Sequence, residues 1–546
     1  MLGLALDLPE KFVRPDMRLI LKLLTCVGIG TLLLSATGEE TAVEGVVRHS
    51  ITGAALKGVI VRLVPHAEEG LGYVASTDEG GAFHFSDVAA AEYRVTLERA
   101  GFATGGTQFL YLQVKVGKQI RNLELKAVPL GAIEGRVVDS DGEPLVGADV
   151  AALRTDWWRG TRVFQAVTSA ITDDRGDFRL SGLEADSYRL FAIARREFTV
   201  TERPGAAEFH VAPTYYPGGQ DVTGSAAIDV AAGQEVRGIE IKLPMAPAFH
   251  VRGRIGFAGK EPNFTITAVR VDAGRRAESF EMYGKKQQDG TFDIHGVPAG
   301  TYEVAVDAFG AQASEPVTVT VGPKDADAGV LRRLLPATVR ARFTLAGETE
   351  QSFGDPMLIL QAASPQPERT AWANAERKRQ PDHGLVFDNY RPGWYHPLLI
   401  SNDFFVESMT FNGQAVDDKG ILLANGSQGE LAVTLARGVA SITGQVKGCA
   451  NCQVVAVAEN VPPGGPGVFG SGTDGSGGFV FRKLVPGKYI VFAVPEDSSW
   501  PWQNATFLRL LREHGAEVEL RAGSSAQVQV SALPLEDLKR AEAQIP

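Results

Sequence analysis

Few residues in this 546-residue chain have the type and spacing for chemistry, and Cys449 and Cys452 are the clearest pair. A Cys-x-x-Cys spacing can serve as a redox dithiol or as half of a zinc site. Neither context is complete, because no helix start follows the pair and the sequence offers no second pair of ligands. The two cysteines are therefore expected to form a small disulfide across a hairpin turn, or to remain as idle thiols, in an oxidising compartment.

Other catalytic motifs are incomplete. Two pairs have the His-x-x-Glu spacing of zinc ligands, but neither is accompanied by a fitting third histidine: His66 with Glu69, and His514 with Glu517. The glycine-rich string 465–470 matches a dinucleotide-binding loop, yet its prolines prevent the helix that must receive a pyrophosphate. The sequence contains no Gly-x-Ser-x-Gly elbow of a serine hydrolase. We therefore predict no enzyme activity, no catalytic residue, no cofactor and no metal ligand.

Two turns, at 139–143 and 173–177, carry several aspartate or glutamate side chains. Oxygen-rich turns can bind calcium, but an EF-type loop needs twelve residues with a bidentate glutamate at its end, which neither turn has. Aspartate and glycine between two strands are first of all turn signals. We interpret both segments as structural turns, with calcium binding as the alternative.

The remaining candidates for ligand binding are aromatic side chains in polar or Pro/Gly-rich loops. Flat rings exposed on loops stack against sugar faces, and they also form hot spots for protein partners. The alternative is that the rings cap the ends of β-sandwiches or pack between neighbouring units. The candidates are Trp157, Trp158, Tyr215, Tyr216, Trp500 and Trp502.

The elements that must position these residues follow a repeated interval of ten residues that ends in a tyrosine. The interval joins Phe83 to Tyr93, Phe178 to Tyr188, Phe292 to Tyr302 and Phe479 to Tyr489, and a degraded copy joins Leu385 to Tyr395. Successive tyrosines are roughly one hundred residues apart, which is within the usual size range of a domain. The repeat therefore predicts five similar units in tandem.

Each unit is predicted to be an antiparallel β-sandwich. Phe83 and Phe85 are two residues apart and so share one face of a strand, and the returning strand alternates in the same way from Tyr93. Short strands separated by polar turns leave no room for the crossover helices of a parallel sheet. The predicted fold class is all-β, a tandem array of about five prealbumin/Ig-like sandwiches after an N-terminal signal helix. One short helix is expected over 504–514.

The unit boundaries follow from the repeat, and the units are numbered 1 to 5 in chain order. They are expected at 42–128, 130–244, 248–335, 337–437 (degenerate) and 440–534, followed by a C-terminal tail at 535–546. If the units contact only their sequence neighbours, their stabilities should be nearly additive.

Unit 2 carries the most specific family pattern. Its segments DSDGEPLVGADV and TDDRGDFRLSGLEADSYRL resemble the carboxypeptidase regulatory-like domain, a transthyretin-like sandwich that is also similar to the Cna B-type repeats of surface adhesins. By repetition the resemblance covers most of the chain. It implies a noncatalytic module grouped with carbohydrate-binding-like folds, in an exported protein of the kind common in environmental Gram-negative bacteria. It implies no particular ligand.

The charge balance bears on the class of partner. Lys plus Arg number 54 and Asp plus Glu 65, so the formal net charge is −11. This acidic balance argues against nucleic acid as a partner, since such binding depends on clustered cations.

The N-terminal segment 1–38 has the pattern of a secretory signal peptide. Arg18 and Lys22 precede an apolar run at 23–34, and small residues follow that run. The residues before Met17 fit the pattern poorly, so Met17 is a candidate for the true start. The alternative is an uncleaved anchor helix, for which the run is short. The expected location is extracellular, or periplasmic and outer-envelope, with no membrane segment after cleavage.

Two functional classes follow from these observations. The first is a secreted or cell-envelope binding or adhesion protein without catalysis, which recognises polysaccharide or another surface component through the loop aromatics. The second is a structural spacer or accessory protein that contacts other envelope proteins.

Overall fold

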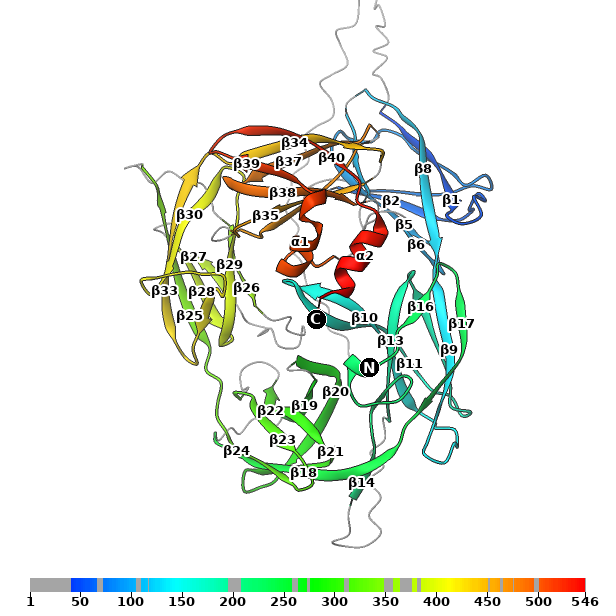
Figure 1. The fold of residues 1–546 in the computed structure, drawn as a ribbon, viewed down its shortest axis with the longest axis vertical. Coiled ribbons are helices and arrows are strands. Elements are labelled where there is room, and N and C mark those ends of the chain that lie inside the picture. Colours follow the sequence, from blue (N-terminus) through cyan, green and yellow to red (C-terminus); the bar gives the residue numbers. More distant parts are fainter. Residues whose placement is uncertain are drawn as a thin grey trace, which may run out of the picture.

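The computed structural model describes most of the chain from residue 41 onward. The described ranges are 41–65, 72–104, 110–115, 117–194, 208–257, 264–272, 275–308, 314–347, 357–363, 376–380, 384–449, 452–461, 465–474, 476–494 and 500–545. The predicted signal segment, together with His66 and Glu69, lies outside them. Within these ranges the regular secondary structure is almost all β-strand, and the chain forms a tandem array of β-sandwiches, as predicted (Figure 1). No helix in these ranges is long and apolar enough to cross a lipid bilayer.

Unit 1 has two four-stranded sheets, in the orders β4-β1-β8-β6 and β3-β2-β5-β7. Its strands are β1 (Val43–His49), β2 (Ile60–Pro65), β3 (Tyr73–Ser76), β4 (Ala82–Phe85), β5 (Glu92–Glu98), β6 (Phe102–Thr104), β7 (Leu110–Gln113) and β8 (Ile120–Pro129).

Unit 2 has a three-stranded sheet, β12-β9-β17, and a five-stranded sheet, β11-β10-β13-β15 with β16 beside β13. Its elements are β9 (Gly131–Val138), β10 (Ala148–Trp158), β11 (Thr161–Ile171), β12 (Asp177–Leu183), β13 (Asp186–Ala194), β14 (Glu208–Val211), β15 (Thr214–Tyr215), the 3-10 turn η1 (Val222–Gly224), β16 (Ile228–Val230) and β17 (Glu235–Lys242). Strand β14 pairs with the first strand of unit 3, so the backbone ladder already crosses from one unit to the next.

The seven strands of unit 3 and β14 of unit 2 form a single eight-stranded sheet, because β14 pairs with β18, and β20 pairs with both β19 and β21 and so joins the two layers. Its strands are β18 (Met245–Ile255), β19 (Phe264–Asp272), β20 (Arg275–Lys286), β21 (Thr291–Pro298), β22 (Gly300–Ala308), β23 (Val317–Val321) and β24 (Ala326–Leu331).

Unit 4 has a six-stranded and a three-stranded sheet, in the orders β27-β28-β25-β33-β30-β31 and β26-β29-β32. Its strands are β25 (Ala337–Leu345), β26 (Met357–Ala362), β27 (Glu376–Arg379), β28 (Leu385–Tyr390), β29 (Gly393–Ile400), β30 (Phe404–Phe411), β31 (Gln414–Ala415), β32 (Ile421–Leu423) and β33 (Gln428–Arg437).

Unit 5 has the sheets β37-β34-β40 and β36-β35-β38-β39, and it carries the two α-helices of the described residues. Its elements are β34 (Ala440–Lys447), β35 (Gln453–Ala458), β36 (Val468–Gly472), β37 (Gly478–Leu484), β38 (Gly487–Val494), α1 (Ala505–Leu511), the 3-10 turn η3 (Arg512–His514), β39 (Ala516–Leu520), β40 (Ser525–Ser531) and α2 (Leu535–Ala543). The helix expected over 504–514 is confirmed by α1 and η3. Within the segment expected as a C-terminal tail at 535–546, residues 535–543 form α2, which buries Leu538 and Ala541 against the unit.

The sandwiches are not purely antiparallel, which corrects the expected strand pattern. In every unit the first strand pairs in parallel with the last: β1 with β8, β9 with β17, β18 with β24, β25 with β33, and β34 with β40. A parallel pair needs a long connection between its strands, and the sequence contains no crossover helix to supply it. In each unit the connection between the two parallel strands consists of the other strands of the sandwich, which lie between them in the sequence.

The repeated phenylalanine packs over a glycine on the first strand of its unit. The opposed pairs are Gly45 with Phe83, Gly135 with Phe178, Gly253 with Phe292 and Gly444 with Phe479. A Cβ atom on Gly253 would lie 2.5 Å from Phe292 Cζ, so the ring fills the space that a side chain would need. In the degraded copy both partners differ, and Ala341 lies opposite Leu385. The narrower leucine leaves room for the alanine methyl group.

The repeated tyrosine closes the loop of its hairpin through its hydroxyl group. In all five units this hydroxyl donates to the carbonyl four residues earlier: Tyr93 to Ala89 (3.0 Å), Tyr188 to Glu184 (2.9 Å), Tyr302 to Pro298 (3.0 Å), Tyr395 to Arg391 (2.9 Å) and Tyr489 to Val485 (2.7 Å). Burial raises the pKa of Tyr188, Tyr395 and Tyr489 to about 12. The degraded unit keeps the bond, which confirms that it belongs to the repeat.

The acidic turns are built from backbone hydrogen bonds. Asp173 Oδ1 accepts two N–H groups of its own turn at 2.9 Å, and Asp139 Oδ1 does the same in the preceding turn. Thr172 Oγ1 ties the second turn to the β9–β10 connection by donating to Leu145 O at 2.6 Å and accepting from Ala148 N at 2.8 Å. These oxygens fix turn geometry, as an Asx turn does.

The five units are not arranged in an extended line. Around Figure 1 the colours run from blue through cyan, green and yellow to red in a ring, with α1 and α2 in its middle. Units 2 and 3 share one apolar cluster, in which Leu153 and Phe191 of unit 2 join Val304 and other residues of unit 3. An ion pair of 3.6 Å links Asp307 of unit 3 to Arg391 of unit 4.

Candidate functional site

The β10–β11 hairpin of unit 2 supplies one side of the most elaborate junction in the described residues. Both strands have 11 residues, and the register runs to Trp158 opposite Thr161. The two turn residues, Arg159 and Gly160, have φ values of 48° and 74°, as a tight type I′ hairpin requires. The hairpin therefore presents Trp157, Trp158 and Gly160 at its tip.

The C-terminal segment of unit 5 supplies the other side. Strands β35 and β38 are buried on both faces, so that Val491 faces the sandwich core while Phe492 faces the helices. Trp502 stacks on Phe492 with ring centroids 5.2 Å apart, and Trp500 stacks on Phe507 of α1 at 6.2 Å. Trp500 and Trp502 are 8% and 7% exposed, so neither ring presents a free face. For these two rings the structure agrees with the alternative interpretation, in which the loop aromatics pack within the protein, and not with an exposed loop platform.

Trp157 joins the two sides. Its ring packs against the apolar cluster formed by α1, α2 and the outer face of β35 and β38. Its indole Nε1 donates to Glu542 Oε1 on α2 at 3.1 Å. The Arg162 guanidinium lies 5.2 Å from the centroid of the Trp157 ring and donates to the carbonyl of Ile545 at 3.2 Å. The hairpin of unit 2 thus holds the last turn of the chain.

The backbone of the hairpin tip fits closely against unit 5. Asn504 caps α1 by accepting from the N–H groups of Thr506 and Phe507, and its Nδ2 donates to Gly160 O at 2.9 Å. A Cβ atom on Gly160 would lie 2.6 Å from the backbone carbon of Gln503. Only glycine fits at this turn position, both for its positive φ and for the space available.

The neighbouring tryptophan reaches a third unit. Trp158 Nε1 donates to the carbonyl of Ala363 in unit 4 at 3.0 Å. Burial lowers the pKa of His396 in unit 4, and the charge of Arg159 at the hairpin tip lowers it further. Units 2, 3 and 4 therefore form a closed circuit of contacts, and unit 5 joins it through unit 2.

Two carboxyl groups at the junction have altered acidity. Burial raises the pKa of Glu542; the Trp157 hydrogen bond and the Arg162 charge oppose this shift, and the Asp186 charge adds to it. Burial also raises the pKa of Asp186 on β13. The junction thus favours a neutral carboxyl group at Glu542 more than water does.

The two tyrosines of the predicted set lie elsewhere. Tyr215 is buried in the cluster shared by units 2 and 3, with its ring 4.7 Å from that of Phe191. Tyr216 is partly buried and packs against the core of unit 2. The hollow that follows them, about 260 Å³, is lined by Thr214, Pro217, Gly218, Gly219, Gln220, Lys242 and Pro244. The fold therefore brings Trp157, Trp500 and Trp502 into one cluster and leaves Tyr215 and Tyr216 apart from it.

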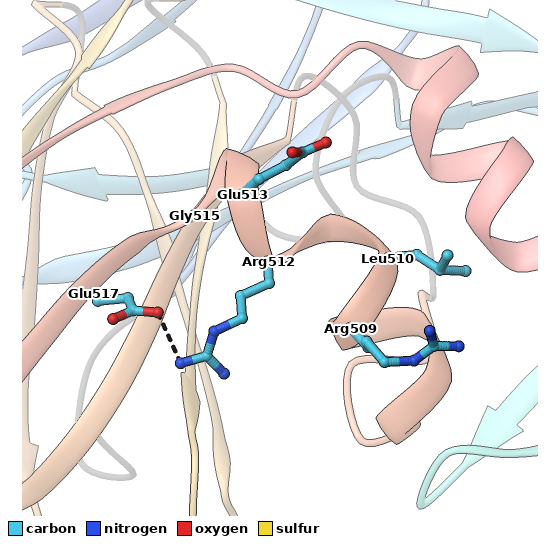
Figure 2. Close-up of a pocket in the computed structure, with 6 residues that line it drawn as sticks. All are labelled: Arg509, Leu510, Arg512, Glu513, Gly515 and Glu517. Atoms are coloured by element: carbon cyan, nitrogen blue, oxygen red, sulfur yellow. Dashed lines mark ion pairs between the residues drawn. The ribbon is translucent and has the colours of Figure 1, made fainter.

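A second, wider hollow of about 610 Å³ lies on unit 5 and is drawn in Figure 2. It is lined by Arg509, Leu510, Arg512, Glu513, Gly515 and Glu517. Arg512 pairs with Glu517 at 2.7 Å and also with Glu459, while His514 Nε2 lies 3.7 Å from Glu513. The members of the His514/Glu517 motif thus have separate partners.

Cys449 and Cys452 are joined by a disulfide bond between sulfurs 2.05 Å apart, with Cα atoms 5.9 Å apart. Cys452 is buried in the core of unit 5, and its backbone N–H donates to Thr473 Oγ1 at 2.8 Å. The bond cross-links two residues of the short loop between β34 and β35.

Sequence reasoning missed two features. The indole of Trp394 on β29 is 44% exposed, opposite Leu422, which is 49% exposed. His250, Asp293 and His295 gather on one face of unit 3. Alternation along FDIH could have placed Asp293 and His295 on one face, but nothing in the sequence pairs them with His250 on another strand.

Comparison with protein families confirms the resemblance for the first two units. Residues 42–126 and 132–243 match the family model of the carboxypeptidase regulatory-like domain. Comparison with curated proteins gives no match.

Solved structures of low similarity were also found. They include the minor pilin GBS52 of Streptococcus agalactiae (16% identity, 41% of this chain and 99% of that chain, TM-score 0.23) and the shaft pilin SpaA of Lactobacillus rhamnosus GG (14%, 41% and 100%, TM-score 0.19). The TIE protein of Bacillus anthracis matches at 12% identity over 87% of this chain and 68% of that chain, with a TM-score of 0.15. Similarity at this level carries no information on arrangement or function.

Proposed function

We propose that this chain, which begins its array with two carboxypeptidase regulatory-like domains, is an exported noncatalytic scaffold protein of the cell envelope or extracellular space. It holds its β-sandwiches in one fixed arrangement and contacts other envelope proteins through them. The observation that carries the proposal is the junction of the β10–β11 hairpin with α1 and α2, where Trp157 meets Glu542.

The junction supports a scaffold over a flexible spacer for an energetic reason. A chain of independent units leaves the loops at the ends of its sandwiches in water. Here Trp157 and Arg162 are instead engaged with residues about 380 positions later, at least three hydrogen bonds connect units 2 and 5, and an apolar cluster lies beneath them. Each such bond contributes about 1 kcal/mol, and burial of the aromatic rings adds more.

Two observations support export. The N-terminal segment has the charge, apolar core and small-residue pattern of a signal peptide. The disulfide between Cys449 and Cys452 belongs to an oxidising compartment such as the periplasm or the extracellular space.

Fractionation of the native host, followed with an antibody against the array, tests the location. A C-terminal tag is unsuitable, because Ile545 is 5% exposed within the junction. The chain is expected in the envelope or the medium, without its N-terminal segment. Recovery of the uncleaved chain from the cytoplasm would contradict export.

Cross-linking in intact cells tests the scaffold role. The wild-type chain should capture a reproducible set of envelope proteins, and Trp157→Ala should capture fewer because the arrangement of units is lost. Val74→Ala changes an exposed side chain of unit 1, outside the junction, and serves as the control. Equal capture by all three chains would argue against a role for the fixed arrangement.

Polysaccharide binding is the second candidate, and it now rests on Trp394. This ring is exposed beside Leu422 on β32, whereas the rings first considered are largely engaged within the protein. An exposed indole offers a flat face for a sugar ring. On a glycan array, binding by the wild-type chain that disappears in Trp394→Ala would support this candidate, and binding by neither chain would remove it.

A further inference from the structure

We propose that His250, Asp293 and His295 form a binding site for a divalent transition-metal ion of the Zn²⁺ class, on the outer face of unit 3. The site is independent of the scaffold role, because it lies away from the junction of units 2 and 5.

Strand alternation places the three side chains together. On β21, Phe292 and Ile294 are 2% and 0% exposed and face the core, so Asp293 and His295 point to the opposite face. On the neighbouring antiparallel strand β18, Val251 is fully buried, so His250 points to that same outer face. Two adjacent strands thus offer two imidazoles and one carboxylate.

The distances suit a single ion. One ligand atom from each residue lies within 4.8 Å of the other two. His250 Nδ1 lies 2.7 Å from Asp293 Oδ1, and the rings of His250 and His295 have centroids 4.7 Å apart at 77°. Around a tetrahedral zinc ion with bonds of about 2.0–2.1 Å, ligand atoms are roughly 3.3 Å apart. Small side-chain rotations close the difference.

Hydrogen bonds to residues outside the proposed ligand set hold the Asp293 carboxylate in place. Asp293 Oδ2 accepts from Arg252 Nε at 3.0 Å, and Arg252 in turn donates to Asp325 at 2.6 Å. Asp325 Oδ1 accepts the backbone N–H of His250 at 3.0 Å. Such outer contacts orient metal ligands in known sites. With neutral histidines, the two aspartates and Arg252 sum to a charge of −1, so a dication is accepted.

The donor set decides the class of ion. Imidazole nitrogen suits zinc, copper, iron and nickel, whereas calcium and magnesium require oxygen ligands. The side chains of His250 and Asp293 are 15% and 19% exposed, and His295 is exposed, so an ion can enter from solvent. Three protein ligands leave a coordination position for water.

Titration of the tag-free mature chain with Zn²⁺ by calorimetry, and with Co²⁺ by visible absorption, tests the proposal. Saturable binding of one ion per chain is expected, with the Co²⁺ bands of nitrogen and oxygen ligation. His295→Ala should weaken binding at least tenfold, and this exposed change leaves the core intact. His84→Ala is the matched control, since His84 pairs with Glu44 at 3.5 Å without a second histidine.

Asp293→Asn provides the second variant, with circular dichroism to verify folding. It should weaken binding while the β-signal is retained. The proposal is overturned if no ion binds, if His295→Ala binds as the wild type does, or if His84→Ala loses binding to the same extent.

Discussion

The indole Nε1 of Trp157 and the carboxylate of Glu542 share a hydrogen bond of 3.1 Å although they are 385 residues apart in the chain. One residue belongs to a hairpin of the second sandwich and the other to the last helix. This contact, with those of Arg162 and Asn504, ties units 2 and 5 together. Units that follow one another in sequence thereby become a closed arrangement.

Replacing Trp157 by alanine should open the junction. The change removes a partly buried ring and one hydrogen bond, so we expect a loss of about 1–3 kcal/mol in the free energy of unfolding. Small-angle scattering should show a larger radius of gyration, and limited proteolysis should become faster near unit 5. Trp394→Ala, which changes an indole that is 44% exposed, should alter neither measurement. Equal effects of the two changes would contradict the role of Trp157.

Gly160 allows a test in which backbone strain is matched. Gly160→Ala adds a methyl group that meets the backbone of Gln503 and Asn504, whereas Gly147→Ala adds one with nothing within 4 Å. Their φ values are 74° and 76°, so both variants carry the same left-handed strain of about 1 kcal/mol. Gly160→Ala should lose roughly 1–3 kcal/mol more in urea unfolding, from overpacking. A difference near zero would show that the hairpin tip does not pack against unit 5 in solution.

At pH 7 the negative charge of ionised Glu542 should destabilise the junction, compared with an uncharged side chain at the same position. Burial raises the pKa of this carboxyl group above its ordinary value. A raised folded pKa gives a contribution that is fully present below the unfolded pKa and is lost as the pH rises through the folded pKa. Glu542→Gln keeps an acceptor for Trp157 without the charge. It should therefore exceed the wild type in stability at pH 7.

The comparison at low pH provides the control for this prediction. Below the ordinary glutamate pKa of 4.5, both proteins are uncharged at this position and their stabilities should converge. Other carboxyl groups titrate in both proteins and largely cancel in the difference. Urea midpoints of the two proteins across the pH range measure the effect, and a constant difference would refute it.

The opposed Gly253 and Phe292 predict coupling between two substitutions. Gly253→Ala should cost about 1–3 kcal/mol, because the new methyl group meets the phenylalanine ring. Phe292→Leu should cost about as much through a cavity. The double variant recreates the Ala341 and Leu385 pair of unit 4 and should cost less than the sum. Chemical unfolding of all four proteins measures the coupling, and simple additivity would contradict the proposed pairing.

The fold could be predicted because its determinants are local and repeated. The ten-residue interval identified the hairpin of each unit, and even the degraded copy at Leu385 and Tyr395 retains its tyrosine hydrogen bond. Asn504 was a recognisable start of a helix, and it caps α1. The parallel pairing of first and last strands could not be predicted, because the two strands of each pair lie at opposite ends of a unit and no local pattern relates them.

Packing of the loop aromatics between units was one of the two interpretations of the sequence, but the partners in the junction could not be predicted for a similar reason. Trp157, Trp500 and Trp502 were correctly selected as unusual residues, but loop aromatics look the same whether they bind a ligand or a neighbouring unit. One signal was available. The run VVAVA of β35 is continuously apolar where a half-buried strand alternates, as expected when both faces are covered. Only the fold reveals that helices and a distant hairpin provide the second cover.

The burial of Ile545 has a kinetic consequence. During synthesis from the N-terminus, the strands of unit 2 (β9 to β17) are complete before α2 and Ile545 are made, so the β10–β11 hairpin stays uncovered until then. Contacts of such high sequence separation form late in folding. A chain that ends before α2 would complete its early sandwiches, and Trp502 would still cover Phe492 on β38, but Trp157 would lose Glu542 and the cover of α2. The more exposed hairpin would mark such a chain for proteolysis.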